Sequence, residues 1–479
     1  MIFTAHCGWT LARALAAGAA CVLAGAFVRR YIAGYRGGVR RVAWILLVVP
    51  YVTPALLVGY GYSHFSLSLV RHPALNELLY GCLVWLRLVP VAAVVLYLAP
   101  APLSAEAAHC RRLLLERDGG VRRRLSYLWF LARSWAPTWI TAAAICSLLA
   151  FGEFEIASLF GARTWTVALF DAHAGGLALV ESLRLAAVPM LVEAAFLVLM
   201  LVALVRGRKW AVAGVQPPAG RTGAGRVLLW AYLLAALAAV AVVPGAVALR
   251  GAVQGIGTLV RDFVLGKDIG ASVVFAAAAA VCAHSLAAPI AARAAAKGSR
   301  WRALVPAVLL AVPGLLGPLV LSLVLVFVFQ APVARAAYDT PIPLLLALTL
   351  VLFPFALVLQ IVLRVFRPRE PLHAAKLLQS SERRSARDWA RRLIWELQAK
   401  RQFWVLLLLF CWGYCDLTAS SILAPSAMTP VTVRLYNLMH YGQAAVLSAM
   451  VCAAFLVPFI LVVVAEGVRG SFVRLLAHG

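Results

Sequence analysis

Acidic residues stand out in this sequence because they interrupt long apolar runs. Glu153 and Glu155 lie in the stretch FGEFEIASLF, and Asp416 lies in WGYCDLTASSIL. Charge inside a membrane is costly unless it has a use, so these carboxylates indicate either the outer mouth of a cation-attracting path or helix ends in interfacial water. Asp171 and Asn437 follow downstream in similar segments and complete the predicted set of pathway residues.

No pattern in the sequence predicts catalysis or a resident cofactor. The chain has 9 histidines, which share no helical spacing and do not predict a metal centre, and 9 cysteines. The cysteines lie mostly inside apolar runs without paired CxxC units, as small buried hydrophobic residues do. We find no nucleophile with an adjacent base and no GxxxxGK[ST] nucleotide motif. We therefore expect a protein that is not an enzyme and holds no metal or cofactor.

The elements that carry these residues are predicted to be membrane-spanning helices. Of the 479 residues, 64% are hydrophobic and 13% are charged, whereas soluble domains contain about half apolar and about a quarter charged residues. A spanning helix needs about 20 apolar residues, so we expect an all-α polytopic membrane protein with about 11 transmembrane helices. The predicted spans are 11–28, 42–62, 78–98, 135–151, 184–205, 227–249, 271–292, 303–329, 342–366, 403–424 and 444–465.

Basic residues are concentrated in alternate loops between these spans. Loops 29–41, 99–134, 206–226, 293–302 and 367–402 carry an excess of Lys and Arg, whereas the other loops are near neutral or acidic. The positive-inside rule makes the first set cytoplasmic, with the N-terminus outside and the C-terminus inside. Membrane topology thus explains the formal net charge of +26 without a nucleic-acid partner.

The sequence also contains an internal repeat. FGEFEIASLF recurs as WGYCDLTASSIL about 261 residues later, and TVALFDAHAGG recurs as TVRLYNLMHYG about 266 residues later. This alignment pairs Glu155 with Asp416 and Asp171 with Asn437. Because the loop charges give both copies the same orientation, we predict two parallel copies of a five-helix core, the second preceded by an extra helix at 227–249.

The predicted domains follow from this duplication. They are a first transmembrane unit of five helices at 1–206, a cytoplasmic linker rich in Gly and Pro at 207–226, and a second unit of six helices at 227–479. A parallel duplication suits a pathway at the interface of the two halves, as in transporters built from repeats.

The largest cytoplasmic loop of each copy lies between its third and fourth core helices. It opens with SAEAAHCRRLLL in the first copy and with EPLHAAKLLQSSERR in the second, and both segments are helix-forming, amphipathic and basic. Glu106 follows Ser104 in the first turn, where a carboxylate complements the helix dipole. Such a helix lies on anionic lipid or docks into a groove on a soluble partner, and the sequence leaves both interpretations open.

Glu106, Ala107 and Ala108 resemble the Glu-Ala-Ala loop of binding-protein-dependent ABC importer permeases, since they follow a proline-bearing helix exit and precede a basic stretch. The segments TVALFDAHAGG and TVRLYNLMHYG resemble those that follow this loop in such permeases. The double-length chain is most similar to the ferric iron permease group, with thiamine permeases close by. Through the repeat, the resemblance covers nearly the whole chain.

The two loops depart from the family pattern in different ways. The family's glycine position is occupied by Arg112 in the first copy and Gln379 in the second. In the second copy His373 stands in place of the glutamate, and Ala374 and Ala375 are retained. Small alanines allow a helix to lie close to a partner, and both copies keep them.

The resemblance implies a multi-pass permease of the bacterial inner membrane. It implies two separate ATPase subunits that bind the cytoplasmic loops, and a periplasmic or surface protein that delivers the substrate, which the resemblance suggests is ferric iron. Thiamine or another small solute is the alternative within the family. An ion-coupled secondary transporter and a non-transporting membrane scaffold are the alternatives outside it.

Overall fold

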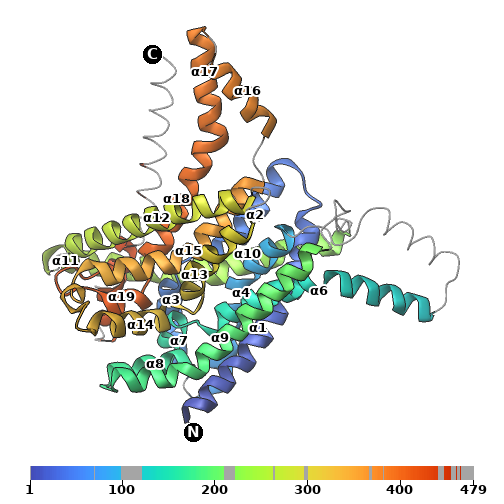
Figure 1. The fold of residues 1–479 in the computed structure, drawn as a ribbon. Helices are drawn as coiled ribbons and strands as arrows, with labels where there is room; N and C mark the ends of the chain where they lie inside the picture. Colours follow the sequence, from blue (N-terminus) through green and yellow to red (C-terminus); the bar gives the residue numbers. More distant parts are fainter. Residues whose placement is uncertain are drawn as a thin grey trace. The chain divides into compact units, whose positions relative to one another are not determined.

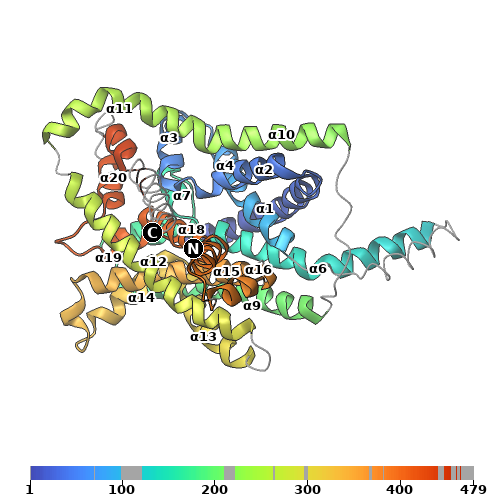
Figure 2. The ribbon, with the colours of Figure 1, turned by 90° about the horizontal axis from the view of Figure 1, so that it is seen from above.

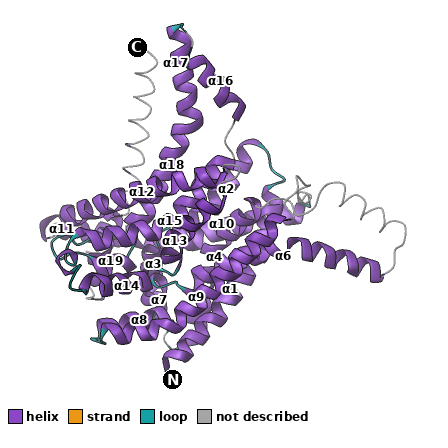
Figure 3. Cartoon of the chain, viewed as in Figure 1, coloured by secondary structure: helices purple, strands orange, loops and turns teal. Residues whose placement is uncertain are grey.

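The computed structural model describes residues 2–69, 71–98, 121–209, 222–262, 265–295, 300–365, 369–380, 382–440, 447–454, 460 and 464. All regular elements in these ranges are helices, and no strand occurs among them (Figure 3). Six helices are long and apolar enough to span a membrane, or up to 8 if each of two bent pairs counts as one span. The chain is therefore an all-α, multi-pass membrane protein.

The chain divides into two compact units, Met1–Val247 and Ala248–Gly479, which we describe separately (Figure 1). The helices of the first unit are α1 (Ile2–Ile32), α2 (Gly37–Val52), α3 (Ala55–Ser68), α4 (Pro73–Leu98), α6 (Val121–Phe151), α7 (Glu155–Phe160), α8 (Trp165–Ala174), α9 (Leu179–Lys209), α10 (Gly223–Leu237), the π-helical η1 (Ala238–Val242) and the start of α11 (Val243–Asp262). The second unit continues with α12 (Leu265–Ala295), α13 (Arg300–Leu315), α14 (Pro318–Gln330), the 3-10 helix η2 (Arg335–Ala337), α15 (Pro341–Val365), α16 (Arg369–Gln379), α17 (Arg384–Ile394), the π-helical η3 (Trp395–Ala399), α18 (Lys400–Tyr414), α19 (Thr418–Leu423) and α20 (Val431–His440).

Helix lengths recur between the two units at a nearly constant spacing. α1 and α12 each have 31 residues, and α2 and α13 each have 16, with both pairs 263 residues apart. α7 and α19 each have 6 residues at the same spacing. α8 and α20 each have 10 residues but lie 266 apart, because a longer loop precedes α20. Packing recurs too, since α1 contacts α4 and α6 as α12 contacts α15 and α18.

Two predicted spans are not continuous helices. The predicted span 42–62 consists of α2 and α3, which are bent by 72°, and the predicted span 303–329 consists of α13 and α14, which are bent by 102°. Pro54 explains the first break, because proline has no N–H and disfavours helix at the preceding residue. At the second break Gly317 adopts a φ of 87°, which a side chain would disfavour. The sequence did not predict these bends, because hydropathy reports the length of an apolar segment and not the direction of its backbone.

The ends of other predicted segments also differ from the structure. The predicted span 403–424 is interrupted, because α18 ends at Tyr414 and α19 begins at Thr418. The predicted linker 207–226 is partly helical, since α9 runs to Lys209 and α10 begins at Gly223, and residues 210–221 lie outside the described ranges. In the predicted span 444–465, residues 447–454 are helical and most of the rest lies outside the described ranges.

Helix α10, which the sequence analysis assigns to the second unit, packs against the first. It lies along α2 and also contacts α1 (Figure 2). The indole Nε1 of Trp230 donates to the hydroxyl of Tyr35 at 2.9 Å. The hydroxyl of Tyr62 donates to the carbonyl of Ala239 at 2.8 Å, within η1, where the altered hydrogen-bond pattern of a π-helix leaves carbonyls available to other donors. Side-chain contacts therefore join α10 and η1 to the first unit.

Helices α16 and α17 form a hairpin beyond the end of α18 (Figure 1). α17, η3 and α18 follow one another without a break from Arg384 to Tyr414, so the hairpin extends a helix of the second unit. α16 packs on α17 through small and apolar residues, of which Leu372, Ala375 and Ala390 are buried.

Candidate functional site

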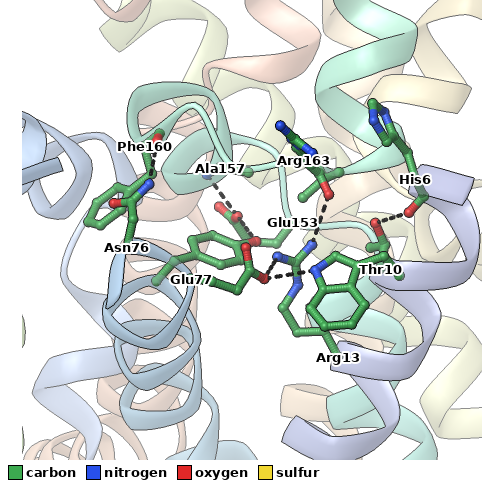
Figure 4. Close-up of polar contacts among 12 residues, drawn as sticks. His6, Thr10, Arg13, Asn76, Glu77, Glu153, Ala157, Phe160 and Arg163 are labelled. Atoms are coloured by element: carbon green, nitrogen blue, oxygen red, sulfur yellow. Dashed lines mark hydrogen bonds and ion pairs between the residues drawn. The ribbon is translucent and has the colours of Figure 1, made fainter. Parts of the chain in front are cut away.

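Glu153 lies in the bend between α6 and α7, and its carboxylate caps the short helix α7. Oε1 accepts the backbone N–H of Ile156 at 2.6 Å, and Oε2 accepts that of Ala157 at 3.1 Å. The hydroxyl of Tyr80 on α4 donates to Oε2 at 2.8 Å. These bonds satisfy N–H groups that a helix start leaves without partners. The acidic side chain therefore has a structural role at this bend (Figure 4).

A line of polar residues on α4 leads to this cap. Glu77, Tyr80 and Arg87 are spaced by three and seven residues and so share one face of α4. Glu77 forms an ion pair with Arg13 of α1 and accepts the indole N–H of Trp9 at 3.2 Å (Figure 4). The guanidinium of Arg13 also lies over the ring of Tyr80, 4.7 Å from its centroid. This face thus connects α4 with α1 and α7.

Arg87 lies further along the same face, at the break between α2 and α3. Its Nη2 donates to the carbonyl of Thr53 at 3.1 Å, and the charge of Arg87 acts on Glu153. Arg87 on α4 and the buried Glu193 on α9 both lie within apolar runs of the sequence. Neither forms a salt bridge in the described part of the chain under a 4.0 Å limit. The spacing of Glu77, Tyr80 and Arg87 by three and seven residues could have indicated from the sequence that they share one face of α4.

Asp416 repeats the capping role of Glu153 in the second unit. Its Oδ2 accepts the backbone N–H groups of Ala419 at 3.0 Å and Ser420 at 3.1 Å, at the start of α19. The hydroxyl of Thr432 donates to the carbonyl of Asp416 at 2.9 Å, as Thr166 donates to that of Glu153 at 2.8 Å. Geometry therefore pairs Asp416 with Glu153, whereas the sequence alignment paired it with Glu155.

The remaining predicted pathway residues are more peripheral. Glu155 is partly buried in the first turn of α7, and Asp171 is exposed on α8. Asn437 is exposed on α20 and lies 266 residues after Asp171, at the same position of an equally long helix. The predicted pairing of Asp171 with Asn437 thus agrees with the helix bounds.

The second unit has polar contacts with no counterpart among those described for the first. His284 on α12, Gln360 on α15 and Gln402 on α18 form a cluster in which the Gln360 amide lies 3.1 Å from His284 Nδ1. The two glutamines exchange hydrogen bonds of 2.7 and 3.3 Å. Arg434 on α20 forms an ion pair with buried Asp268 on α12. Sequence analysis missed these residues because they come from distant helices without a shared motif.

The predicted partner-binding residues fall into two groups. Glu106, Ala107, Ala108 and Arg112 lie outside the described residues. In α16, His373, Ala374 and Gln379 are exposed and Ala375 is 0% exposed. Ala375 therefore serves the contact of α16 with its own chain, whereas His373 and Ala374 are accessible to a partner.

Nothing in the described ranges gathers three or more His, Cys, Asp or Glu side chains into a potential metal site. Comparisons with protein-family models, curated proteins and solved structures find no match to this chain. The interpretation of the site therefore depends on its own geometry.

Proposed function

We propose that this chain is the membrane permease subunit of an ABC importer in the bacterial inner membrane. It would contain about 11 transmembrane helices arranged as two parallel five-helix repeats, with the solute path at their interface. The observation that supports this best is the recurrence of helix lengths and packing at a spacing of 263 residues. Each copy includes a broken span, a feature of transporters that bind solute at the centre of the membrane.

In this proposal the cytoplasmic loops bind a pair of separate ATPase subunits. The α16–α17 hairpin supports this role because it extends α18 and presents Ala374 and Leu377, of which Leu377 is 61% exposed. An apolar side chain and a small one beside each other suit a helix that inserts into a groove. Movement of the hairpin would be transmitted along α17 and η3 to α18. A binding protein would deliver the solute on the opposite side.

Co-purification with an ABC ATPase from the same organism tests the coupling. We expect Ala374→Arg, together with replacement of Glu106, Ala107 and Ala108, to abolish recovery of the ATPase while leaving the permease folded. Ser385→Arg is the matched control, since Ser385 is exposed on neighbouring α17. ATPase binding that survives deletion of both loops would rule out the proposal.

The proposed substrate is ferric iron, which depends on the sequence resemblance alone. Uptake of labelled iron and of labelled thiamine in a deletion strain separates the two solutes. If neither solute is transported, the proposed identity of the substrate is wrong, even if ATPase binding is intact.

An ion-coupled secondary transporter is the second candidate function, and two partly buried carboxylates favour it. Glu153 and Asp416 both lie at helix breaks, where such transporters bind ions. This alternative predicts uptake that persists without ATP and stops when the ion gradient is dissipated.

A membrane scaffold that transports nothing is the remaining alternative. Transport of any solute by the reconstituted chain would exclude it.

A further inference from the structure

Glu193 is an acidic residue in the interior of the first unit that the site above does not use. It lies at the centre of α9, which runs from Leu179 to Lys209, and it is 1% exposed. Its Oε2 is buried and has no hydrogen-bond partner. Full burial of an ionised carboxylate without a counter-ion is strongly unfavourable, and more so where the surroundings are lipid. The side chain must therefore be neutral or hold a cation.

The carboxyl group of Glu193 faces the bend between α6 and α7. A Cβ built on Gly152 would lie 3.6 Å from Glu193 Oε1, and α9 packs along α6. Gly152 directly follows the end of α6 at Phe151. A helix C-terminus carries partial negative charge, so it adds to the cost of an ionised Glu193. The bend thus favours a proton on this carboxyl group.

The positive charges near the bend are engaged elsewhere. Arg87 donates to Thr53 and acts electrostatically on Glu153, whose carboxylate also receives two backbone N–H groups and the hydroxyl of Tyr80. The charge of Glu153 is therefore compensated, whereas that of Glu193, the second acid at the bend, is not. Among the described residues no ion pair joins Glu193 to a cation, so the charges balance when Glu193 carries a proton.

In the part of the chain that the structure describes, no other titratable group forms an ion pair with Glu193. The thiol of Cys7 on α1 interacts electrostatically with it, and a thiol is no cation. On α8, which also packs against α9, Asp171 is exposed and His173 lies 3.3 Å from Ser182, about three turns before Glu193. On α9 itself, Glu181 and Arg184 are exposed near the helix start.

We propose that Glu193 is a proton-binding site within the membrane, occupied while α9 packs against the α6–α7 bend and emptied when that contact opens. Water that entered the bend would stabilise the carboxylate, so opening would release one proton. Conversely, a low pH would hold the bend closed. This inference goes beyond the proposed transport function and does not depend on it, since it concerns the chain alone.

Infrared spectroscopy of the purified full chain in lipid vesicles tests the proposal directly. We expect the carbonyl band of a protonated carboxylic acid at neutral pH, absent from Glu193→Gln and shifted in frequency in Glu193→Asp. Glu181→Gln is the matched control, because Glu181 is an exposed acid on the same helix, and it should leave the band unchanged. Absence of the band from the unmodified chain, or its persistence in Glu193→Gln, would overturn the proposal.

Stability as a function of pH provides a second measurement, useful if one variant folds poorly. A proton bound in the folded state alone makes the folded-to-unfolded ratio fall about tenfold for each pH unit above the ordinary range of glutamate, until Glu193 also loses its proton in the folded chain. Glu193→Gln should lose this dependence and Glu181→Gln should keep it. Equal pH dependence in all three proteins contradicts proton binding. A second outcome would also contradict it: sodium stabilises the unmodified chain but not Glu193→Gln, and the infrared band of a protonated acid is absent. The site would then hold a metal ion.

Discussion

At the scale of single residues, the partly buried acids Glu153 and Asp416 are explained first by local backbone geometry. Glu153 and Asp416 each lie where one helix ends and a short helix begins, and each accepts two backbone N–H groups of the following helix. A carboxylate suits this position because it accepts hydrogen bonds and complements the helix dipole. Sequence analysis found both residues through their contrast with apolar neighbours. It could not find their roles, because those depend on where the helices break.

Replacement of Glu153 by Ala tests the capping role. We expect a loss of about 2 kcal/mol or more in the free energy of unfolding, since two backbone N–H groups and the hydroxyl of Tyr80 lose their acceptor. Glu153→Gln should cost about half as much, because the amide keeps one acceptor oxygen. Thermal denaturation in detergent measures both. Glu155→Gln serves as the control, and an equal loss in that variant would contradict the assignment.

Asp339 provides a pH-dependent contact in a loop of the second unit. It accepts the backbone N–H and the hydroxyl of Ser426 at 2.9 and 2.8 Å, and these hydrogen bonds lower the pKa of its carboxyl group. An acid whose pKa is lower in the folded chain stabilises the fold above its unfolded pKa, and this stabilisation is lost as the pH falls through the folded pKa.

We therefore expect Asp339 to hold the loops 331–340 and 424–430 together at neutral pH and to release them in acid, below about pH 4. Limited proteolysis of the two loops measures this. Cleavage should rise in acid for the unmodified chain, whereas Asp339→Ala should be cleaved at the same high rate at every pH. A variant that is protected at neutral pH would show that Ser426 is held by other contacts.

At the scale of helices, sequence patterns predicted where apolar segments occur better than how they bend. The predicted span 78–98 lies within α4 and 271–292 lies within α12, because both are long and mostly apolar. The breaks in 42–62 and 303–329 were missed although a proline lies at each of them, Pro54 before α3 and Pro318 at the start of α14. Proline also occurs inside continuous helices here, at Pro90 of α4 for example. Its presence alone therefore does not decide between a kink and a break.

Close helix packing makes a further prediction at Gly314 of α13. A Cβ at this position would clash with the carbonyl oxygen of Leu350 on α15, which is backbone and cannot move aside. We expect Gly314→Ala to destabilise the second unit by about 3 kcal/mol or more, because the two helices must separate. Gly270→Ala on α12 is the control, since nothing lies within 4 Å of its Cβ position. Equal melting temperatures for the two variants would contradict the close approach.

At the scale of the whole chain, the boundary between the compact units differs from the boundary between the sequence copies. The predicted boundary between the copies is the linker 207–226, but the first compact unit extends to Val247 and includes α10. The apolar run 227–249 correctly predicted a helix in this part of the chain. It could not assign the helix to a unit, because that depends on contacts such as Trp230 with Tyr35 and Gly225 with Tyr31.

Splitting the chain tests this arrangement. Fragments divided after residue 215 place α10 on the second fragment, so its packing against α1 and α2 must join the two. We expect Trp230→Ala to reduce co-purification of these fragments by about tenfold or more, since it removes an aromatic contact and a hydrogen bond. Leu228→Ala should have little effect, because Leu228 is an exposed residue of the same helix. In a chain divided after residue 263, α10 stays on the first fragment, so Trp230→Ala should no longer alter co-purification. An equal effect of Trp230→Ala in both divisions would mean that α10 does not hold the fragments together.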